Sequence, residues 1–236
     1  MPDHETIYRT AAQRYEQLIA REDYCGNLLK ALKDIRSFEG LDIIDIGAGT
    51  GRLACLLAPY AKSVTAVDES AAMLQVAAEK LRKAGCGKGT TICSDHRSLP
   101  VPDASADVVT AGWTVCYVAS SNVDGWERHL RKTLAEIERV LRPGGTAIII
   151  ETLGTGCTRP SAPKALAPYY DRLVREYGFE SRWIRTDFRF DSTEEAEELI
   201  RFFFGDELAG RTAAARSPVV PECTGIWWRR SVGSNH

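Results

Sequence analysis

The sequence predicts an α/β protein with a mostly parallel sheet that helices cover on both faces. Two observations lead to this prediction. Short segments rich in β-branched residues alternate with helical segments along residues 41–151, the order that right-handed crossovers between parallel strands require. The runs Ile43-Ile44, Val108-Val109 and Ile148-Ile149-Ile150 are apolar without interruption, which is typical of strands that are buried on both faces.

Each element of this pattern has its own signal. Residues 3–35 carry apolar side chains every three or four positions in two groups, which predicts helices. Ser70 is suited to cap the helix that follows it, and Pro143-Gly144-Gly145 stops a long amphipathic helix. The predicted strands are 41–46, 63–68, 90–93, 106–110 and 146–151, and the predicted helices between them are 52–60, 71–84 and 123–141.

The C-terminal third gives weaker signals. A helix is predicted over 163–177, a strand within 178–190 and an acidic-then-aromatic helix over 193–204. Residues 211–221 are small and polar enough to predict a loop, and 223–230 predict the last strand.

Composition indicates an ordinary globular protein. The 236 residues carry 30 Lys and Arg against 32 Asp and Glu, and the formal net charge of −2 excludes a strongly basic nucleic-acid binder. No apolar run approaches the roughly 18 residues that a membrane helix needs, and residues 1–5 do not resemble a secretory signal. The seven cysteines are odd in number and form no CxxC pair. We therefore expect a protein of the reducing cytoplasm that has no disulfide framework and no metal site.

A glycine-rich turn follows the first predicted strand and identifies a ligand. The dinucleotide pattern GxGxxG would place its third glycine at position 52, but the sequence has Gly47-x-Gly49-x-Gly51 and then Arg52. Asp45 would repel a pyrophosphate and favour a cationic ligand, while Asp68 ends the second strand, where a carboxylate can accept from both ribose hydroxyls. A ligand with a ribose and a positive charge but no phosphate fits this turn, and S-adenosylmethionine (SAM) has these groups.

In these residues the sequence resembles the class I SAM-dependent methyltransferases, and most of all the small soluble enzymes related to the ubiquinone and menaquinone C-methyltransferases. The likeness spans residues 41 to 151 and is carried by the segments 42–52, 67–74, 94–95, 99–109 and 140–146. It implies a Rossmann-like, doubly wound, seven-stranded sheet with an antiparallel last strand. It also implies SAM as cofactor, S-adenosylhomocysteine as product and an N-terminal helical lid.

The resemblance also implies roles for individual residues. Gly47 and Gly49 would line the methionine part of SAM, with Asp45 near its amino group. Asp68 would hold the ribose, and Asp95 would accept from the adenine amine. The full set of predicted cofactor-binding residues is Tyr15, Asp45, Gly47, Ala48, Gly49, Asp68, Glu69, Met73, Asp95, His96 and Gly112.

Taken singly, several of these residues have a structural alternative. Asp45 could be a helix-dipole partner of Arg52 or a solvated strand end, Asp68 could cap the next helix, and Met73 could be part of the core.

The acceptor side is predicted from residues around the same edge. Methyl transfer from a sulfonium mainly requires alignment, exclusion of water and, for some acceptors, removal of a proton. The candidates for catalysis are Tyr15, Asp23 and His96, and Asp23 has the alternative of a surface charge. The candidates for contact with the acceptor are Tyr8, Tyr24, Trp113, Tyr117 and Glu151, the last at the rim of the acceptor site.

The predicted function is methyl transfer from SAM to an O, N or C atom of a small molecule, without nucleic acid or membrane as partner. A nicotinamide-dependent oxidoreductase and a catalytically silent SAM-binding regulator are the alternatives. The chain is predicted to be one domain over 1–236, with a lid in 1–40, a SAM-binding core in 41–151 and acceptor-pocket elements in 152–236. A monomer or a homodimer is expected.

Overall fold

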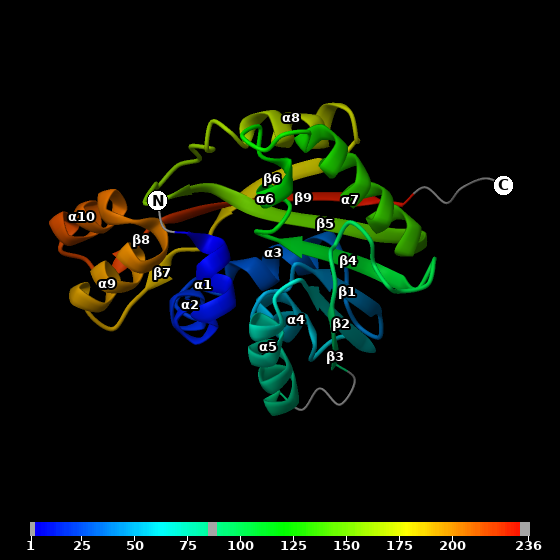
Figure 1. Ribbon diagram of the computed structural model, residues 1–236, viewed down its shortest axis with the longest axis horizontal. Coiled ribbons are helices and arrows are strands. Elements are labelled where there is room, and N and C mark those ends of the chain that lie inside the picture. The colour runs from blue at the N-terminus through cyan, green and yellow to red at the C-terminus, as the bar shows by residue number, and fades with distance from the viewer. Residues whose placement is uncertain (1–2, 85–88, 232–236) are drawn as a thin grey trace.

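The computed structural model describes residues 3–84 and 89–231, and a seven-stranded sheet runs through its centre (Figure 1). Its strands are β1 (Asp42–Ile46), β2 (Ser63–Asp68), β3 (Gly89–Cys93), β4 (Ala106–Gly112), β5 (Leu141–Thr155), β6 (Glu180–Arg185) and β9 (Glu222–Arg230). They lie in the order β3-β2-β1-β4-β5-β9-β6. The first five strands of this order are parallel, and β9 is antiparallel to both β5 and β6. The predicted seven-stranded, mostly parallel sheet with an antiparallel last strand is therefore confirmed.

Helices cover both faces of the sheet. The helices of the described residues are α1 (His4–Thr10), α2 (Ala12–Ile19), α3 (Asn27–Ile35), α4 (Arg52–Leu57), α5 (Ala71–Lys83), α6 (Cys116–Ala119), α7 (Trp126–Val140), α8 (Ala167–Arg175), α9 (Thr193–Phe204) and α10 (Asp206–Ala215). Buried side chains of α3, α4 and α5 pack with Ile43, Val108 and Ile148 of the sheet. Those of α7 and α8 pack on the opposite face with Ile44 and Ile149. Alternate residues of one strand thus enter opposite cores, which explains the uninterrupted apolar runs.

A third, smaller core lies beyond the carboxyl edge of the sheet. It brings α1 and α2 against α9, α10 and the two-stranded sheet of β7 (Phe188–Arg189) and β8 (Val219–Val220), with Ile7, Leu18 and Phe203 among its buried side chains. Figure 1 shows this lobe on the left, with its helices α1 and α2 on the side toward α5. Of the predicted lid 1–40, α1 and α2 belong to this lobe, whereas α3 packs on the sheet.

The structure differs from the predicted elements most clearly in two places. The predicted loop 211–221 is wrong, because α10 continues to Ala215 and β8 follows it. The alanines of this segment are strong helix formers, and their small size had hidden the helical periodicity. The strand predicted from residue 146 already begins at Leu141, since that residue pairs with Ala106 before the register shifts across Pro143-Gly144-Gly145. Among the described residues, no helix has both the length and the apolar character to cross a membrane.

Candidate active site at the carboxyl edge of the sheet

The glycine-rich turn joins β1 to α4 at the carboxyl edge of the sheet. Gly47, Gly49 and Gly51 have φ of +59°, +54° and +78°, in the left-handed region that favours glycine. A Cβ on Gly47 would also overlap the side chain of Thr114, which lies directly against it. The three glycines therefore suit the shape of the turn, and Gly47 also allows its close contact with the segment after β4.

Asp68 at the end of β2 is tied to this turn. Its Oδ2 accepts from the amide of Gly49 at 2.8 Å, and its Oδ1 accepts from the amide of Ser70 at 2.8 Å. Burial raises the pKa of Asp68. A carboxylate offers about four acceptor positions, so two remain for a ligand.

Asp45 has a different environment. It is 1% exposed, and its oxygens accept from the Thr110 hydroxyl at 2.7 Å and from the Ala54 amide at 3.0 Å. Burial raises the pKa of Asp45 to about 7. The carboxyl group thus joins β1, β4 and the first turn of α4. Its partners are Thr110 and Ala54 rather than Arg52, and its burial is not that of a solvated strand end.

Three other predicted cofactor-binding residues, Met73, Ala48 and Gly112, take part in packing around the turn and α4. The Cε atom of Met73 would be 3.4 Å from a Cβ on Gly49. Ala48 is buried, and its amide donates to Val67 at 2.9 Å. Gly112 makes room for Leu53, since a Cβ there would lie 2.6 Å from its Cδ1.

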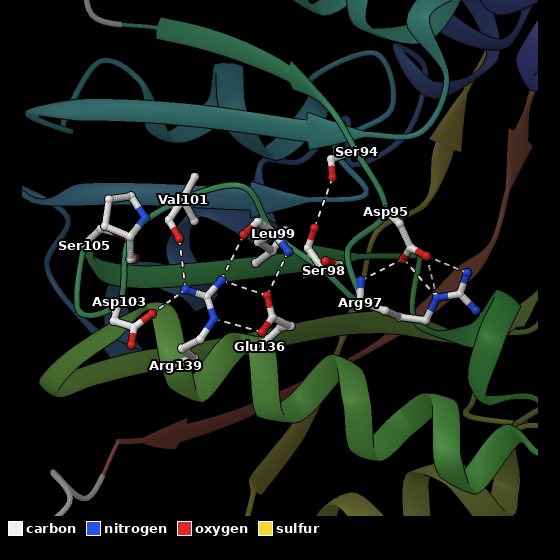
Figure 2. A network of polar contacts seen from close by, with 11 residues as sticks. Ser94, Asp95, Arg97, Ser98, Leu99, Val101, Asp103, Ser105, Glu136 and Arg139 are labelled. Atoms are coloured by element: carbon white, nitrogen blue, oxygen red, sulfur yellow. Dashed lines mark hydrogen bonds and ion pairs between the residues drawn. The ribbon is translucent and has the colours of Figure 1, made fainter.

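Asp95 follows β3 and is engaged by Arg97. The Nε of Arg97 donates to both oxygens of Asp95 at 2.9 Å (Figure 2). Burial alone would raise the pKa of Asp95, but the hydrogen bonds from Arg97 outweigh it and the pKa is lowered. Arg97 also contacts His129 at 3.1 Å and lies 3.9 Å from Glu69, whose side chain is 60% exposed.

Two residues of α7 fasten the loop that carries Asp95. Arg139 donates to the carbonyl oxygens of Leu99 and Val101, each at 2.9 Å, and Glu136 accepts from the Leu99 amide at 2.7 Å (Figure 2). The loop between β3 and β4 is therefore held by directional contacts rather than by apolar burial alone.

His96, the neighbour of Asp95, is 8% exposed, and its Nε2 is buried without a hydrogen-bond partner among the described residues. Burial lowers the pKa of His96, so the ring is neutral near pH 7.

Three predicted tyrosines meet above the edge. The hydroxyl groups of Tyr8 and Tyr117 are hydrogen-bonded, and the ring of Tyr15 packs edge-on against Tyr8 with 5.3 Å between centroids. Burial raises the pKa of both Tyr8 and Tyr15. Ser70 donates to the Tyr8 carbonyl at 3.0 Å, which places this cluster beside the end of β2.

Trp113 and Arg52 pack together at the same edge of the sheet. Trp113 has φ of +50°, an uncommon conformation for a bulky residue, and the Arg52 guanidinium lies 4.1 Å from its ring centroid. Arg52 also forms a salt bridge of 2.5 Å with Glu22, whose side chain is 4% exposed.

Asp23 and Tyr24 lie away from the tyrosine cluster. Both oxygens of Asp23 accept from the first amides of α3, those of Asn27 at 2.9 Å and Leu28 at 3.0 Å. The Asp23 carboxylate therefore serves the helix, and Glu22 is the acidic residue that faces Arg52. The Tyr24 ring is 43% exposed and contacts Arg189 of β7 at 4.6 Å.

Glu151, a candidate for the rim of the acceptor site, is buried in this structure. It is 0% exposed, and its Oε1 accepts from the Cys116 amide at 2.9 Å. Burial raises the pKa of Glu151 to about 8.

Several residues of this edge were missed by the sequence analysis. His4 and Phe203 join the tyrosine cluster through ring contacts of His4 with Tyr117 and Phe203. Glu222 is buried near Glu22 and Arg52, and its pKa is raised to about 8 by burial and by Glu22. Only contacts between distant parts of the chain bring them together, so no local pattern marks them.

Comparisons with known proteins agree with this architecture. The family model described as "Methyltransferase domain" matches residues 44–149. The chain is 26% identical over 210 residues to a demethylmenaquinone methyltransferase of Staphylococcus aureus, which covers 82% of this chain and 80% of that protein. It is 33% identical over 151 residues to a malonyl-[acyl-carrier protein] O-methyltransferase of Serratia marcescens, covering 64% of this chain and 52% of the relative.

A solved structure, a SAM-dependent methyltransferase of Aquifex aeolicus, superposes with a TM-score of 0.54 at 18% identity, covering 96% of this chain and 93% of that one. This likeness shows the fold. The matching family model and the relatives leave the alternative of a nicotinamide-dependent oxidoreductase without support. Residues 44–149 thus match a methyltransferase domain, and the chain is similar to the class I SAM-dependent methyltransferases related to the menaquinone C-methyltransferases.

Proposed function

We propose that the protein transfers the methyl group of SAM to an O, N or C atom of a small-molecule acceptor held under α1 and α2. The observation that carries the proposal is the hydrogen bond from Gly49 to Asp68, because it joins the glycine-rich turn to a carboxylate with acceptor positions left. The near-neutral net charge of −2 favours a metabolite over a nucleic acid.

The residues present fit SAM. Asp68 would accept from the ribose hydroxyls, and the turn of Gly47 and Gly49 would line the methionine part. Met73 and His96 would pack near the adenine, and Asp95 would reach its amine while Arg97 holds the carboxylate. Asp45 would support the turn without contacting SAM directly, since both its oxygens already accept hydrogen bonds from the protein.

Thr114 covers Gly47 in this structure, so we propose that the segment from Trp113 to Cys116 shifts when SAM binds. The left-handed conformation of Trp113 supports this, because such strain is often stored where a segment changes shape. The same shift would uncover Glu151, which accepts from Cys116.

The acceptor would lie against Tyr8, Tyr15 and Tyr117, whose rings offer apolar faces with hydroxyl groups. In this division, α1 and α2 are the lid, residues 41–151 are the cofactor core, and parts of 152–236 complete the acceptor pocket. We propose a cytoplasmic monomer or homodimer. Quinones and acyl-carrier thioesters are the acceptor chemistries named for its relatives.

The test is transfer of tritium from methyl-labelled SAM to two probes, demethylmenaquinol and malonyl-acyl-carrier protein. Labelled product with either probe, together with S-adenosylhomocysteine, supports the proposal. A protein that binds SAM but releases no S-adenosylhomocysteine with these probes or with an extract of small metabolites would be a silent SAM binder.

A further inference from the structure

We propose that His4 accepts the proton that the acceptor loses during methyl transfer, and that Tyr8 and Tyr117 pass this proton to it. The inference rests on the proposed function and adds a class of acceptor to it. Three hydrogen bonds carry it, and they link α1, α6 and α9 across the lid.

The direction of these hydrogen bonds follows from their last member. The Nε2 of His4 lies 3.0 Å from the carbonyl oxygen of Phe203, which can only accept, so Nε2 bears the hydrogen. In the neutral ring Nδ1 must then accept, and it does so from the Tyr117 hydroxyl at 3.2 Å. The Tyr117 oxygen is left to accept from the hydroxyl of Tyr8.

The first member of this relay faces the reaction edge. Tyr8 packs against Tyr15, and its carbonyl accepts from Ser70, two residues after Asp68. With its own hydrogen donated to Tyr117, the Tyr8 oxygen can accept from an acceptor group beside SAM. Burial raises the pKa of Tyr8, so this group favours the neutral form and passes a proton on rather than staying ionised.

His4, the last member of the relay, can accept a second proton on its imidazole ring. The imidazole of His4 stacks on Phe203 with 4.2 Å between centroids and 3° between planes. A second proton on Nδ1 leaves the bond from Nε2 to the Phe203 carbonyl intact and strengthens it. Tyr117 is 44% exposed, so the proton can pass to water before the next turnover.

The step balances. The acceptor's X–H bond breaks, and its proton goes to Tyr8 while the Tyr8 proton goes to Tyr117 and the Tyr117 proton goes to His4. For methylation of O or N, the electron pair left on the acceptor atom forms the bond to the methyl carbon. For methylation of a ring carbon of a hydroquinone, the O–H pair forms a C=O bond, a ring C=C pair forms the bond to the methyl carbon, and the C–H proton at that carbon then returns to the oxygen. In each case the pair of the sulfur–methyl bond stays on sulfur. The positive charge of the sulfonium thus ends on the His4 imidazolium.

Such a relay is useful only for an acceptor that carries a proton. A hydroquinone, another hydroxyl compound or an amine fits this condition. An acceptor that is already a carboxylate does not need a base. The relay therefore favours demethylmenaquinol over the carboxylate of malonyl-acyl-carrier protein.

The protonation state can be measured without turnover. The chain has four histidines, so the ring ¹⁵N signals of His4 can be assigned by their loss in His4→Gln. We expect the tautomer with hydrogen on Nε2 in the wild-type protein, and a shifted Nδ1 signal in Tyr117→Phe. Hydrogen on Nδ1 in the wild type would overturn the direction of the relay.

Activity with demethylmenaquinol tests the proton transfer. His4→Ala should lower kcat about 100-fold or more, the usual contribution of a general base, while calorimetry shows SAM affinity within about twofold of wild type. Imidazole should restore part of kcat, whereas pyrazole, a ring of the same size and a far weaker base, should not. Restoration by both rings would show that His4 acts by packing alone and would overturn the proposal.

Tyr117→Phe and Tyr8→Phe keep the rings and remove the relaying hydroxyls, so each should also lower kcat while leaving SAM affinity unchanged. The control is Tyr60→Phe, whose ring contacts Lys33 away from the lid and which should keep wild-type kcat. Wild-type kcat in both relay variants, or methylation of malonyl-acyl-carrier protein alone by a protein that binds SAM, would contradict the relay. A wild-type protein that does not bind SAM would instead contradict the proposed function.

Discussion

The carboxylate of Asp68 accepts a 2.8 Å hydrogen bond from the amide of Gly49, which links the end of β2 to the turn after β1. The same carboxylate is the proposed acceptor for the ribose hydroxyls of SAM. One side chain would thus both shape the turn and bind the ligand.

Asp68→Ala should weaken SAM binding by about 2 kcal/mol or more, since a charged acceptor is lost and the Gly49 amide is left without it. Asp68→Asn retains one acceptor oxygen and should lose less. Calorimetry with SAM measures both variants, and an unchanged dissociation constant in Asp68→Ala would remove this residue from the site.

Gly47→Ala should destabilise the protein and prevent SAM binding. The substitution adds left-handed strain of about 1–2 kcal/mol and an overlap with Thr114. Gly40→Ala is the matched control, because Gly40 has φ of +72° with open space around its Cα. Denaturant unfolding should show a larger loss for Gly47→Ala than for Gly40→Ala, and equal losses would mean that Thr114 gives way freely.

Arg139→Met should cost about 1–3 kcal/mol of unfolding free energy, because the carbonyls of Leu99 and Val101 would lose a charged donor. Arg175→Met removes an exposed pair with Asp171 and should change stability by no more than about 0.5 kcal/mol. Urea unfolding compares the two variants. A loss as small in Arg139→Met as in Arg175→Met would show that the loop after β3 is held by other contacts.

Glu151 should make the protein less stable as the pH rises. Its pKa is raised from 4.5 to about 8 by burial, so between these values the folded state keeps a proton that the unfolded state releases. Stability then falls with rising pH, by about 1.4 kcal/mol for each unit of pKa shift, and levels off above pH 8.

Glu151→Gln cannot ionise and should flatten this decline when unfolding is measured from pH 5 to pH 8. Glu198→Gln, at a side chain 67% exposed, should leave the wild-type slope. Parallel profiles for the wild type and Glu151→Gln would contradict the raised pKa.

The parts of the fold that local pattern determines were predictable. The predicted strand 63–68 coincides with β2, and the predicted helix 193–204 coincides with α9. In both cases one periodicity is uninterrupted and the ends carry clear signals, such as Ser192, which caps α9. The helix α10 was missed because its alanines give little periodicity.

The candidate site was predictable where it depends on a turn and strand ends, as for Gly49 and Asp68. It was not predictable where side chains choose among partners. Asp23 was a candidate base, but it binds the amides of α3, and Glu22 faces Arg52 instead. His4 meets Phe203 only because α1 and α9 pack together, a contact that no sequence spacing encodes.

Calorimetric titration of the wild-type protein with SAM, S-adenosylhomocysteine and NADH tests the central claim most directly. The glycine spacing, Asp45 and Asp68 predict binding of SAM and S-adenosylhomocysteine, with no heat of binding for NADH. Tight binding of NADH without binding of either SAM or S-adenosylhomocysteine would contradict the account.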